Sequence, residues 1–421
     1  MGARTVAITG IGWVSSIGCD EVTVRDSLRL GRSGIRSVKW PPGAEQSPVK
    51  VAGTVPEFDV SVPQWMRWQM PARHQIRREA LRAFAPQGVY ACCAVFDALA
   101  DAGLEEAALA DPETGLFCAS VGSPLMMRHY LEQMSASRGA RGHPLGVVSS
   151  IAGTLNFNLG AYFKIKGANL GFVSACASSS HALAYAMEEI RHGRQKRMVV
   201  VGAEEVTAET VVPFAAMRAL SVQSGCDASR PFDRSRDGFV ASGGAVALIL
   251  EEGSLAQARG ARARAFATGW GQASDGHNVA ISHEEGDGLA RSMMRALDDA
   301  GLSPGDIGHI NAHATSTVIG DLSEARAIGR VFHDALDVPV SSTKALTGHA
   351  LSMAGALEAG LACLALEEER VPRQWHLHEV DSGCAHLHLP REDLPLQRPN
   401  ILTNSSGFGG SNVTLILSRS P

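Results

Sequence analysis

The chain has 421 residues, with 43 acidic and 38 basic side chains and a formal net charge of −5. Its hydrophobic and charged fractions, 45% and 19%, are typical of globular proteins and exclude a disordered or fibrous chain. The acidic balance disfavours nucleic-acid binding, which requires a basic surface. The 44 glycines indicate many tight turns or close backbone approaches.

Signals for a membrane span or a metal centre are missing from the sequence. No stretch approaches the roughly 18 consecutive apolar residues that a transmembrane helix requires. The eight cysteines are sparse and form no pair of C-x-x-C repeats that would hold zinc. We therefore expect a cytoplasmic protein without a membrane span or a metal, in which most thiols are buried.

Three short sequence patterns occur twice, in the same order. Each copy begins with a strand and Thr-Gly-x-Gly, continues with a helix ending in Ala-Leu-x-Asp-Ala-Gly-Leu, and then has a short apolar strand. The first copy comprises residues 5–12, 98–104 and 115–119, and the second comprises residues 265–271, 296–302 and 308–312. This order predicts a tandem duplication of βα units, with an insertion between Leu30 and Val89 in the first copy.

The first of these patterns, Thr9 to Gly12, has two interpretations. A glycine pair after a strand could open a dinucleotide-binding loop, but Ser15 stands where the third glycine of that loop should be. We therefore predict that these residues form a tight turn.

The other predicted elements alternate between strands and helices. We predict strands at residues 170–173, 198–201, 401–403 and 413–417, helices at 178–192 and 352–369, a glycine-rich hairpin loop at 405–411, and a joint between the two halves at 251–263. This alternation predicts an α/β protein built around a partly parallel sheet.

Cys176 lies between the strand predicted at 170–173 and the helix that begins near Ser178. A thiol at a helix N-terminus faces free backbone N–H groups and the positive end of the helix dipole. We therefore expect the pKa of Cys176 to be lowered. Taken alone, a cysteine among serines is more often structural than catalytic.

Two polar segments that follow strands in the second half favour a catalytic interpretation. His313 lies in Asn-Ala-His-Ala-Thr-Ser-Thr, and Lys344 and His349 share the segment 341–349. Either histidine alone is more often a structural residue. We interpret four later histidines, which alternate along a polar segment, as surface residues rather than metal ligands: His376, His378, His386 and His388.

Five motifs occur in order along nearly the whole chain, at residues 173–179, 230–240, 313–321, 342–349 and 404–410. Together they resemble the elongating β-ketoacyl-[acyl carrier protein] synthases of the thiolase superfamily, nearer to the type I than to the type II bacterial enzymes. The resemblance implies the thiolase fold, with two βαβαβαββ halves in a five-layer α-β-α-β-α arrangement. Residues 1–253 would hold the nucleophilic cysteine and an inserted cap region, and residues 254–421 the two histidines.

The resemblance also implies a decarboxylative condensation. Cys176 would take an acyl group from the phosphopantetheine arm of an acyl carrier protein, and His313 and His349 would promote decarboxylation of malonyl-[acyl carrier protein]. Two N–H donors suit this step because they can stabilise the enolate oxygen. Lys344, with Glu358, would organise the charge around the histidines. No cofactor is implied, because phosphopantetheine enters on the carrier protein.

Other residues complete the implied site. The backbone N–H groups of Cys176 and Phe408 would bind the tetrahedral oxyanion, and the Phe408 ring would gate the acyl pocket. Four further residues are implied to contact the substrate or its pantetheine arm: Thr315, Thr317, Gly409 and Gly410.

The implied partner, an acyl carrier protein, is acidic, so we expect a basic docking surface in spite of the net negative charge. The candidates are Arg78, Arg82, Arg138 and Arg141, although a solvated helix face and loop explain these arginines equally well. The resemblance further implies a homodimer, with Ile151 contributing to the pocket across the interface. A heterodimer with a chain-length partner stays open.

Several positions depart from the family pattern. Ala314 replaces a glycine, Val318 a proline, residues 351–353 a small Leu-Gly-Ala run, and Ser406 an aromatic residue. Added bulk at Met353 or lost bulk at Ser406 would reshape the acyl channel. The alternative to fatty acid elongation is therefore a ketosynthase of a specialised polyketide or polyene pathway.

Related enzyme classes fit the sequence less well. A reversible thiolase would have a second catalytic cysteine where Ser405 and Ser406 stand, and starter-unit enzymes have an asparagine in place of His349. A non-catalytic chain-length subunit would have lost the nucleophile, whereas Cys176 is present.

Overall fold

The computed structural model describes residues 4–421. Ten strands form one mixed sheet in the order β10-β9-β13-β14-β8-β1-β7-β6-β4-β5. The first half supplies β1 (Val6–Ser15), β4 (Thr114–Ala119), β5 (Asn169–Phe172), β6 (Arg197–Glu204) and β7 (Gly244–Glu252). The second half supplies β8 (Ala265–Ser274), β9 (His309–Asn311), β10 (Val340–Ser341), β13 (Asn400–Gly407) and β14 (Ser411–Ser418).

The two halves have the same topology. Outward from the centre, the first half runs β1-β7-β6-β4-β5 and the second β8-β14-β13-β9-β10, and β1 and β8 join them through a short antiparallel pairing at Ala7 and Ile8. The main helices are α3 (Pro86–Ala102), α6 (Leu155–Phe163) and α7 (Ser178–Arg191) in the first half, and α11 (Asp287–Ala300), α12 (Val318–Val331) and α14 (Ala354–Glu367) in the second. Each half therefore reads βαβαβαββ, which confirms the predicted duplication and fold.

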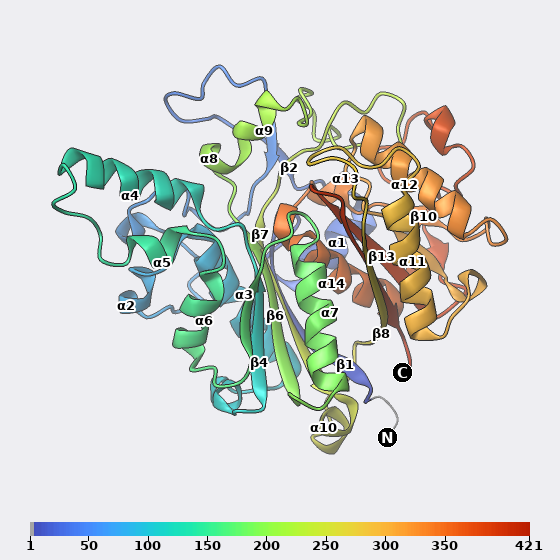
Figure 1. The fold of residues 1–421 in the computed structure, drawn as a ribbon, viewed down its shortest axis with the longest axis horizontal. Helices are drawn as coiled ribbons and strands as arrows, with labels where there is room; N and C mark the ends of the chain where they lie inside the picture. Colours follow the sequence, from blue (N-terminus) through green and yellow to red (C-terminus); the bar gives the residue numbers. More distant parts are fainter. Residues whose placement is uncertain (1–3) are drawn as a thin grey trace.

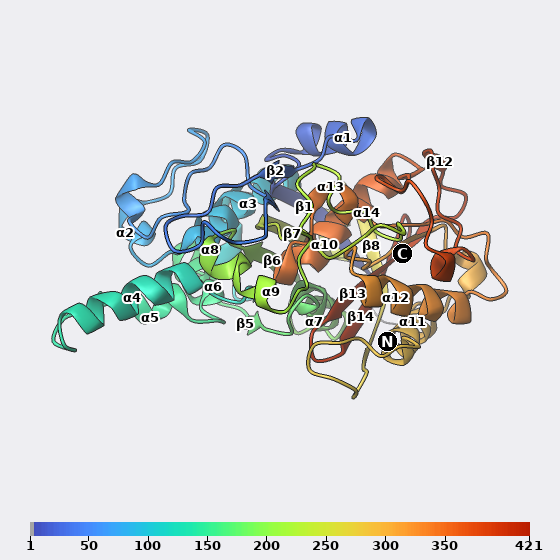
Figure 2. The same cartoon turned by 90° about the horizontal axis from the view of Figure 1, so that it is seen from above.

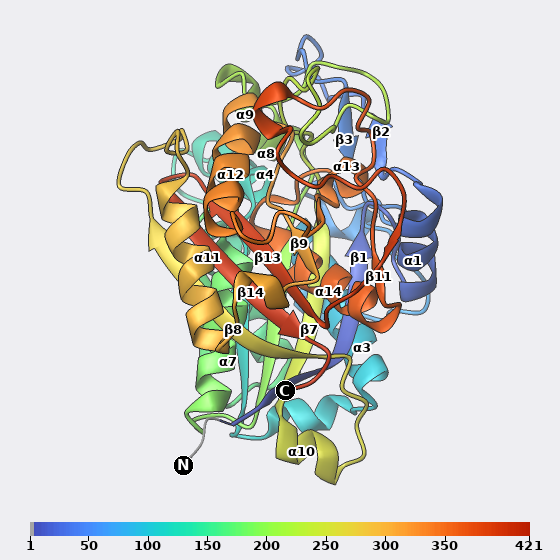
Figure 3. The ribbon, with the colours of Figure 1, turned by 90° about the vertical axis from the view of Figure 1, so that its right-hand side faces the viewer.

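The helices form three layers around the two halves of the sheet. Helices α7 and α14 contact each other and strands of both halves, so they form the central layer, visible in the middle of Figure 1. Helix α3 packs on the outer face of β1, β6 and β7, and α6 packs on β4. On the opposite side, α11 packs on β8 and β14, with α12 beside it, as Figure 3 shows. The result is the five-layer arrangement implied by the resemblance.

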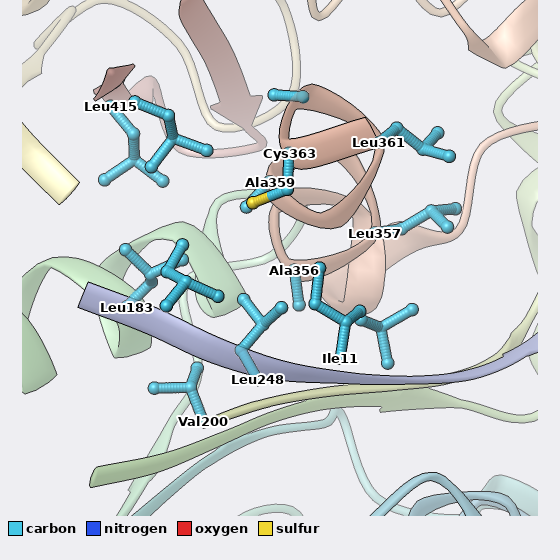
Figure 4. Packing of buried hydrophobic residues seen from close by; sticks show 14 of the residues in the cluster. Ile11, Leu183, Val200, Leu248, Ala356, Leu357, Ala359, Leu361, Cys363 and Leu415 are labelled. Carbon is cyan, nitrogen blue, oxygen red and sulfur yellow. The ribbon is translucent and has the colours of Figure 1, made fainter. Parts of the chain in front are cut away.

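The central layer owes its position to composition. Helix α14 is almost entirely buried and its residues are mostly alanine and leucine, because it has sheet on both sides. Figure 4 shows Ala356 of α14 facing Ile11 and Leu248 of the first half, while Leu415 of β14 lies on another side of the helix. This packing buries the core across both halves.

The prediction of a tight turn at Thr9 to Gly12 is wrong. These residues continue β1, and a Cβ atom on Gly12 would lie 1.8 Å from the carbonyl oxygen of Ala94 in α3. The second copy repeats this contact: a Cβ on Gly271, in β8, would lie 2.2 Å from the carbonyl oxygen of Ser292 in α11. The repeated glycines therefore allow a helix to approach a strand closely.

The remaining predicted elements are present with small changes in their bounds. The hairpin loop predicted at 405–411 is shorter, because β13 and β14 extend toward each other and leave only residues 408–410 between them. The buried helix predicted at 352–369 begins with a 3-10 turn, η4 (Leu351–Met353), before α14. The predicted joint at 251–263 contains the short helix α10 (Gly253–Ala258).

Smaller elements decorate this core. They are α1 (Glu21–Leu30), β2 (Ile35–Ser37), β3 (Val51–Gly53), α2 (Arg78–Leu81), α4 (Pro124–Ala136), α5 (Gly146–Ser150), α8 (Ala208–Val211), α9 (Pro213–Ala216), α13 (Lys344–Thr347), β11 (Arg370–Val371) and β12 (Leu394–Pro395). Helix α4 projects from the first half in both Figure 1 and Figure 2. None of the helices in residues 4–421 is both long and apolar enough to span a bilayer.

Candidate active site

Cys176 lies in a sharp turn between β5 and α7. The preceding residue, Ala175, has a φ of 51°, which is unfavourable for a residue with a side chain. Ser178 fastens this turn: its hydroxyl accepts a hydrogen bond from the backbone N–H of Ser174 at 2.8 Å and donates to the carbonyl of Ala175 at 2.6 Å. The turn at Cys176 is therefore strained and held by local polar contacts.

The β13–β14 connection lies against this turn. A Cβ atom on Gly407 would lie 2.6 Å from the carbonyl oxygen of Ser174 and 3.2 Å from the backbone nitrogen of Cys176. Glycine at this position therefore lets the chain before Phe408 approach the backbone of Cys176.

His313 follows β9, and a buried carboxylate fixes its backbone. The N–H groups of His313 and Ala314 donate to Glu324 at 2.9 and 2.6 Å, and the Asn404 amide donates to the same carboxylate at 3.0 Å. Sequence reasoning missed Glu324, which lies on α12. The available signal was its place just after the Gly320-Asp321 end of the His313 motif.

Lys344 and His349 follow β10. The backbone of His349 is held on both sides, since its N–H donates to the carbonyl of Val240 at 2.7 Å and its carbonyl accepts from Ser242 at 2.9 Å. The Lys344 ammonium donates to Glu358 of α14, and both side chains are buried. The structure thus brings Lys344 and Glu358 into direct contact next to the histidines.

These segments meet at one point. The Nε2 atom of His349 lies 2.9 Å from the sulfur of Cys176. The rings of His313 and His349 are nearly perpendicular, with centroids 5.3 Å apart, and Phe239 packs edge-on against His349 at 5.4 Å. A thiol and two imidazoles from opposite halves of the chain therefore face one another.

Burial is the largest influence on the pKa values of these groups. It lowers the pKa of His313 and that of His349 well below 6.5, and the charge of Lys344 lowers both further, so both rings are neutral at pH 7. Burial also raises the pKa of the Cys176 thiol to about 12, although Lys344 opposes this effect. The expected lowering of the thiol pKa is therefore wrong, because desolvation outweighs the helix terminus.

The three reactive groups line a cavity of about 880 Å³. Its walls include four of the residues implied to contact substrate: Thr315, Thr317, Phe408 and Gly410. The hydroxyls of Thr315 and Thr317 are 3.2 Å apart. Gly409 is not among the lining residues, and its N–H donates to the carbonyl of Val279 at 2.8 Å.

The family departures divide between the cavity and the core. Ala314, Val318, Ser352 and Ser406 line the cavity, and Ser406 donates to Asn412 at 2.7 Å. Met353 is fully buried in the central core and is not among the lining residues. Added bulk at this position therefore enters the core.

The predicted docking arginines are exposed but lie away from the cavity lining. Arg78 and Arg82 belong to the α2 region, where Arg82 lies over the ring of Trp65 at 6.0 Å, and Arg138 and Arg141 follow α4. Arg218, which sequence reasoning missed, is exposed and lines the cavity. Within residues 4–421, no group of three or more His, Cys, Asp or Glu side chains is placed to hold a metal ion.

Two known protein-family domains match most of the chain. Residues 3–256 match the N-terminal domain of β-ketoacyl synthases, and residues 264–378 match their C-terminal domain. The chain belongs to the β-ketoacyl synthase family.

Individual β-ketoacyl synthases are similar over their whole length. The 3-oxoacyl-[acyl-carrier-protein] synthase 1 of Haemophilus influenzae is 36% identical, with 99% of each chain covered. A β-ketoacyl synthase structure from Burkholderia phymatum is 32% identical with a TM-score of 0.90, and a structure described as the ishigamide ketosynthase/chain length factor is 30% identical with a TM-score of 0.88. Each of these structures covers 99% of this chain and is itself 99% covered.

Proposed function

We propose that the protein is an elongating β-ketoacyl-[acyl carrier protein] synthase. It condenses an acyl group on Cys176 with malonyl-[acyl carrier protein] and releases carbon dioxide and a β-ketoacyl-[acyl carrier protein]. The observation that carries this proposal is the contact of the Cys176 sulfur with His349 at 2.9 Å, beside His313, in one cavity. A nucleophile and two N–H donors are the groups that this reaction needs.

In the first step, the thiol of Cys176 attacks the acyl thioester of the carrier protein. Because its pKa is raised to about 12, the thiol must lose its proton during the attack, and Nε2 of neutral His349 is placed to accept it. The bond between the carbonyl carbon and the pantetheine sulfur then breaks, and the departing thiolate takes the proton. The N–H groups of Cys176 and Phe408 stabilise the tetrahedral oxyanion.

In the second step, the carbon–carbon bond to the malonyl carboxylate breaks and its electron pair forms an enolate. His313 and His349 donate N–H groups to the enolate oxygen, and the carbanion then attacks the acyl-cysteine. Carbon dioxide departs, and the Cys176 sulfur leaves as a thiolate and takes up a proton from solvent. Nδ1 of each ring is buried without a hydrogen-bond partner, so neither tautomer is fixed, and His349 can accept in the first step and donate in the second.

The substrate arrives on a carrier protein. Thr315 and Thr317, whose hydroxyls are 3.2 Å apart on the cavity wall, would bind the pantetheine arm. Gly410, together with Gly409 before it, would border this arm. Arg218 on the cavity wall would meet the acidic carrier near the pocket mouth. The outlying docking candidates are Arg78, Arg82, Arg138 and Arg141.

The active protein is proposed to be a homodimer. Strand β5 is the last strand of the sheet, and Leu170, Val173 and nearby Phe157 have 53%, 56% and 55% of their surfaces exposed. An exposed edge strand with apolar side chains favours pairing with another chain. Ile151, which is 39% exposed, would reach the partner's pocket. We place the division between the halves at residues 253 and 254, and the enzyme in the cytoplasm with its carrier protein.

A second candidate is a ketosynthase of a specialised polyketide or polyene pathway, alone or with a chain-length partner. Ser352 and Ser406 on the cavity wall support it, because they change the volume and polarity around the acyl group. The two candidates differ in the acyl groups that Cys176 accepts. Mass spectrometry of Cys176 after incubation with carrier proteins that bear saturated, polyene or β-keto chains of graded length would separate them.

The proposed reaction is tested by substituting Cys176→Gln. We expect condensation to be lost by a factor on the order of 10³ or more, while malonyl-carrier protein is still decarboxylated, because His313 and His349 remain. The matched control is Cys226→Ala, which removes an exposed thiol and should leave condensation unchanged. Condensation retained in Cys176→Gln would refute the assignment.

A further inference from the structure

One histidine of α7, His181, connects the Cys176 turn to the other half of the sheet. Its Nδ1 lies 2.8 Å from the hydroxyl of Ser174, and its Nε2 lies 3.0 Å from the side-chain oxygen of Gln272 on β8. Ser174 precedes the strained Ala175 by one residue, so the histidine contacts the turn where its backbone must be held.

The surroundings of His181 determine its tautomer. The Gln272 amide nitrogen donates to the Tyr185 hydroxyl at 3.2 Å, which orients the amide oxygen toward His181. This oxygen only accepts hydrogen bonds, so Nε2 of His181 carries a proton. Burial lowers the pKa of His181, so the ring is neutral at pH 7 and its Nδ1 accepts the hydrogen of the Ser174 hydroxyl.

Aromatic side chains lie beside the ring of His181. It stacks on Tyr185 with a centroid distance of 6.4 Å, and Tyr185 contacts Trp270 of β8 at 5.3 Å and Phe172 of β5 at 5.7 Å. The polar chain from Ser174 through His181 to Gln272 is therefore flanked by aromatic side chains at the boundary of the two halves.

The turn at Cys176 needs such support. Its φ of 51° at Ala175 is unfavourable, and Gly407 presses on its backbone from the other half. A relaxation of this turn would move the sulfur away from His349, which lies 2.9 Å from it. A displacement of about 1 Å is enough to lower a reaction rate by about two orders of magnitude.

We propose that His181 is a positioning residue for the nucleophile, which holds Ser174 and thereby keeps Cys176 in contact with His349. The proposal rests on the proposed function only in taking Cys176 as the nucleophile. His181 does not line the cavity, so it acts through the turn and does not touch substrate.

The test is the reactivity of Cys176 toward iodoacetamide, followed by mass spectrometry of its peptide, together with condensation kinetics. In His181→Ala we expect alkylation of Cys176 and kcat to fall about tenfold, the effect of losing one hydrogen bond of about 1.4 kcal/mol, with KM for the acyl carrier substrate unchanged. His181→Asn places an amide at the position of Nδ1 and should restore both rates. His181→Gln places it at the position of Nε2 and should not.

Two further variants make the result specific. His192 directly follows α7, and 58% of its side-chain surface is exposed. His192→Ala should therefore behave as the wild type. Ser174→Ala removes only the donor and should lower alkylation and kcat as His181→Ala does, which keeps the test decisive if His181→Ala does not fold.

The outcomes separate the proposal from the assignment of the reaction. If both His181→Ala and Ser174→Ala showed the alkylation rate and kcat of the wild type, the positioning role would be overturned. Condensation by the wild type would still support the proposed reaction. Equal loss in His181→Asn and His181→Gln would also overturn the positioning role, because the contact with Ser174 would then not be the one that matters. If alkylation fell in His181→Ala but the wild type showed no condensation, the proposed reaction would be refuted instead.

Discussion

The edge strands β5 and β10 hold equivalent places at the two ends of the sheet, yet of these two strands the described residues 4–421 cover only β10. The backbone N–H of Val340 in β10 donates to the carbonyl of His388 at 2.9 Å, and both residues of β10 are buried. In β5, by contrast, Leu170 is 53% exposed. Within residues 4–421 we find no counterpart of this late segment over β5, which is why we propose that this edge pairs with another chain.

The loops after these strands differ in chemistry as well. The loop after β5 carries Cys176, and the loop after β10 carries Lys344 and His349, each just before a helix of the central layer. The same place in the topology thus holds the proposed nucleophile in one half, and the Lys344 charge and a proposed N–H donor in the other. A complete site requires both halves, because ligands bind where strand ends from the two halves meet.

The largest predicted effect concerns the chemistry of the second half. We expect His313→Ala to lower decarboxylation of malonyl-carrier protein by about 10²–10³, the cost of losing one preorganised N–H donor. Because Cys176 and His349 remain in contact, acylation of Cys176 should be nearly unchanged, and mass spectrometry measures it separately. Decarboxylation at the wild-type rate would contradict the division of labour between the halves.

The second prediction concerns the two edges. Leu170→Asp places a carboxylate on the exposed edge of the first half, and we expect the dissociation constant of the dimer to rise at least about a hundredfold, because a buried carboxylate is costly. Analytical ultracentrifugation measures the change. Val22→Asp, at a position on α1 that is 71% exposed, is the control and should dimerise as the wild type does. An unchanged dimer in Leu170→Asp would place the interface elsewhere.

A third prediction tests whether the halves pack alike. Gly12→Ala and Gly271→Ala each add a Cβ atom to a strand, where it would collide with the backbone of the neighbouring helix. The Cβ atoms would lie 1.8 and 2.2 Å from a helix carbonyl oxygen. Each should lower the free energy of unfolding by about 1–3 kcal/mol or more, as overpacking does, measured by urea denaturation. Gly305→Ala, where the nearest atom would be 3.7 Å away, should be nearly neutral. A neutral effect at only one of the two glycines would show that the repeat is not packed equivalently.

The prediction with the smallest expected effect concerns Glu204 at the end of β6. The equivalent position, at the end of β13 in the other half, is Gly407. Burial raises the pKa of Glu204 to about 8 from 4.5, although the hydroxyl of Ser352 donates to it and opposes this. The folded state therefore keeps a proton that the unfolded state loses, so stability falls as pH rises from about 4.5 to 8.

Glu204→Gln removes this titration and should gain up to about 3 kcal/mol relative to the wild type between pH 5 and pH 8. Urea denaturation at the two pH values measures the difference. Exposed Glu392→Gln is the control and should show no such gain. A constant difference between Glu204→Gln and the wild type would mean that Glu204 is ionised in the fold.

Most of the fold could be predicted from the sequence, because its two copies repeat the same apolar periodicity. Helix α7, for example, buries Leu183, Met187 and Ile190 on one face, as their spacing predicts. The predicted turn at Thr9 to Gly12 is wrong, because glycine pairs occur both in turns and where a helix packs closely on a strand. Only the contact of α3 with β1 distinguishes these two cases.

The sequence by itself predicted the candidate reactive groups of this protein: Cys176, His313, Lys344 and His349 stand in motifs that can be read along the chain. Only the tertiary structure decided which other residues contact these groups and how deeply the groups are buried. The contacts of Glu324 with the His313 backbone and of His181 with Ser174 join residues that only the fold brings together, and the raised pKa of Cys176 follows from its burial. Local patterns specify elements and chemistry, whereas desolvation and support come from residues that are distant in sequence and meet only in the fold.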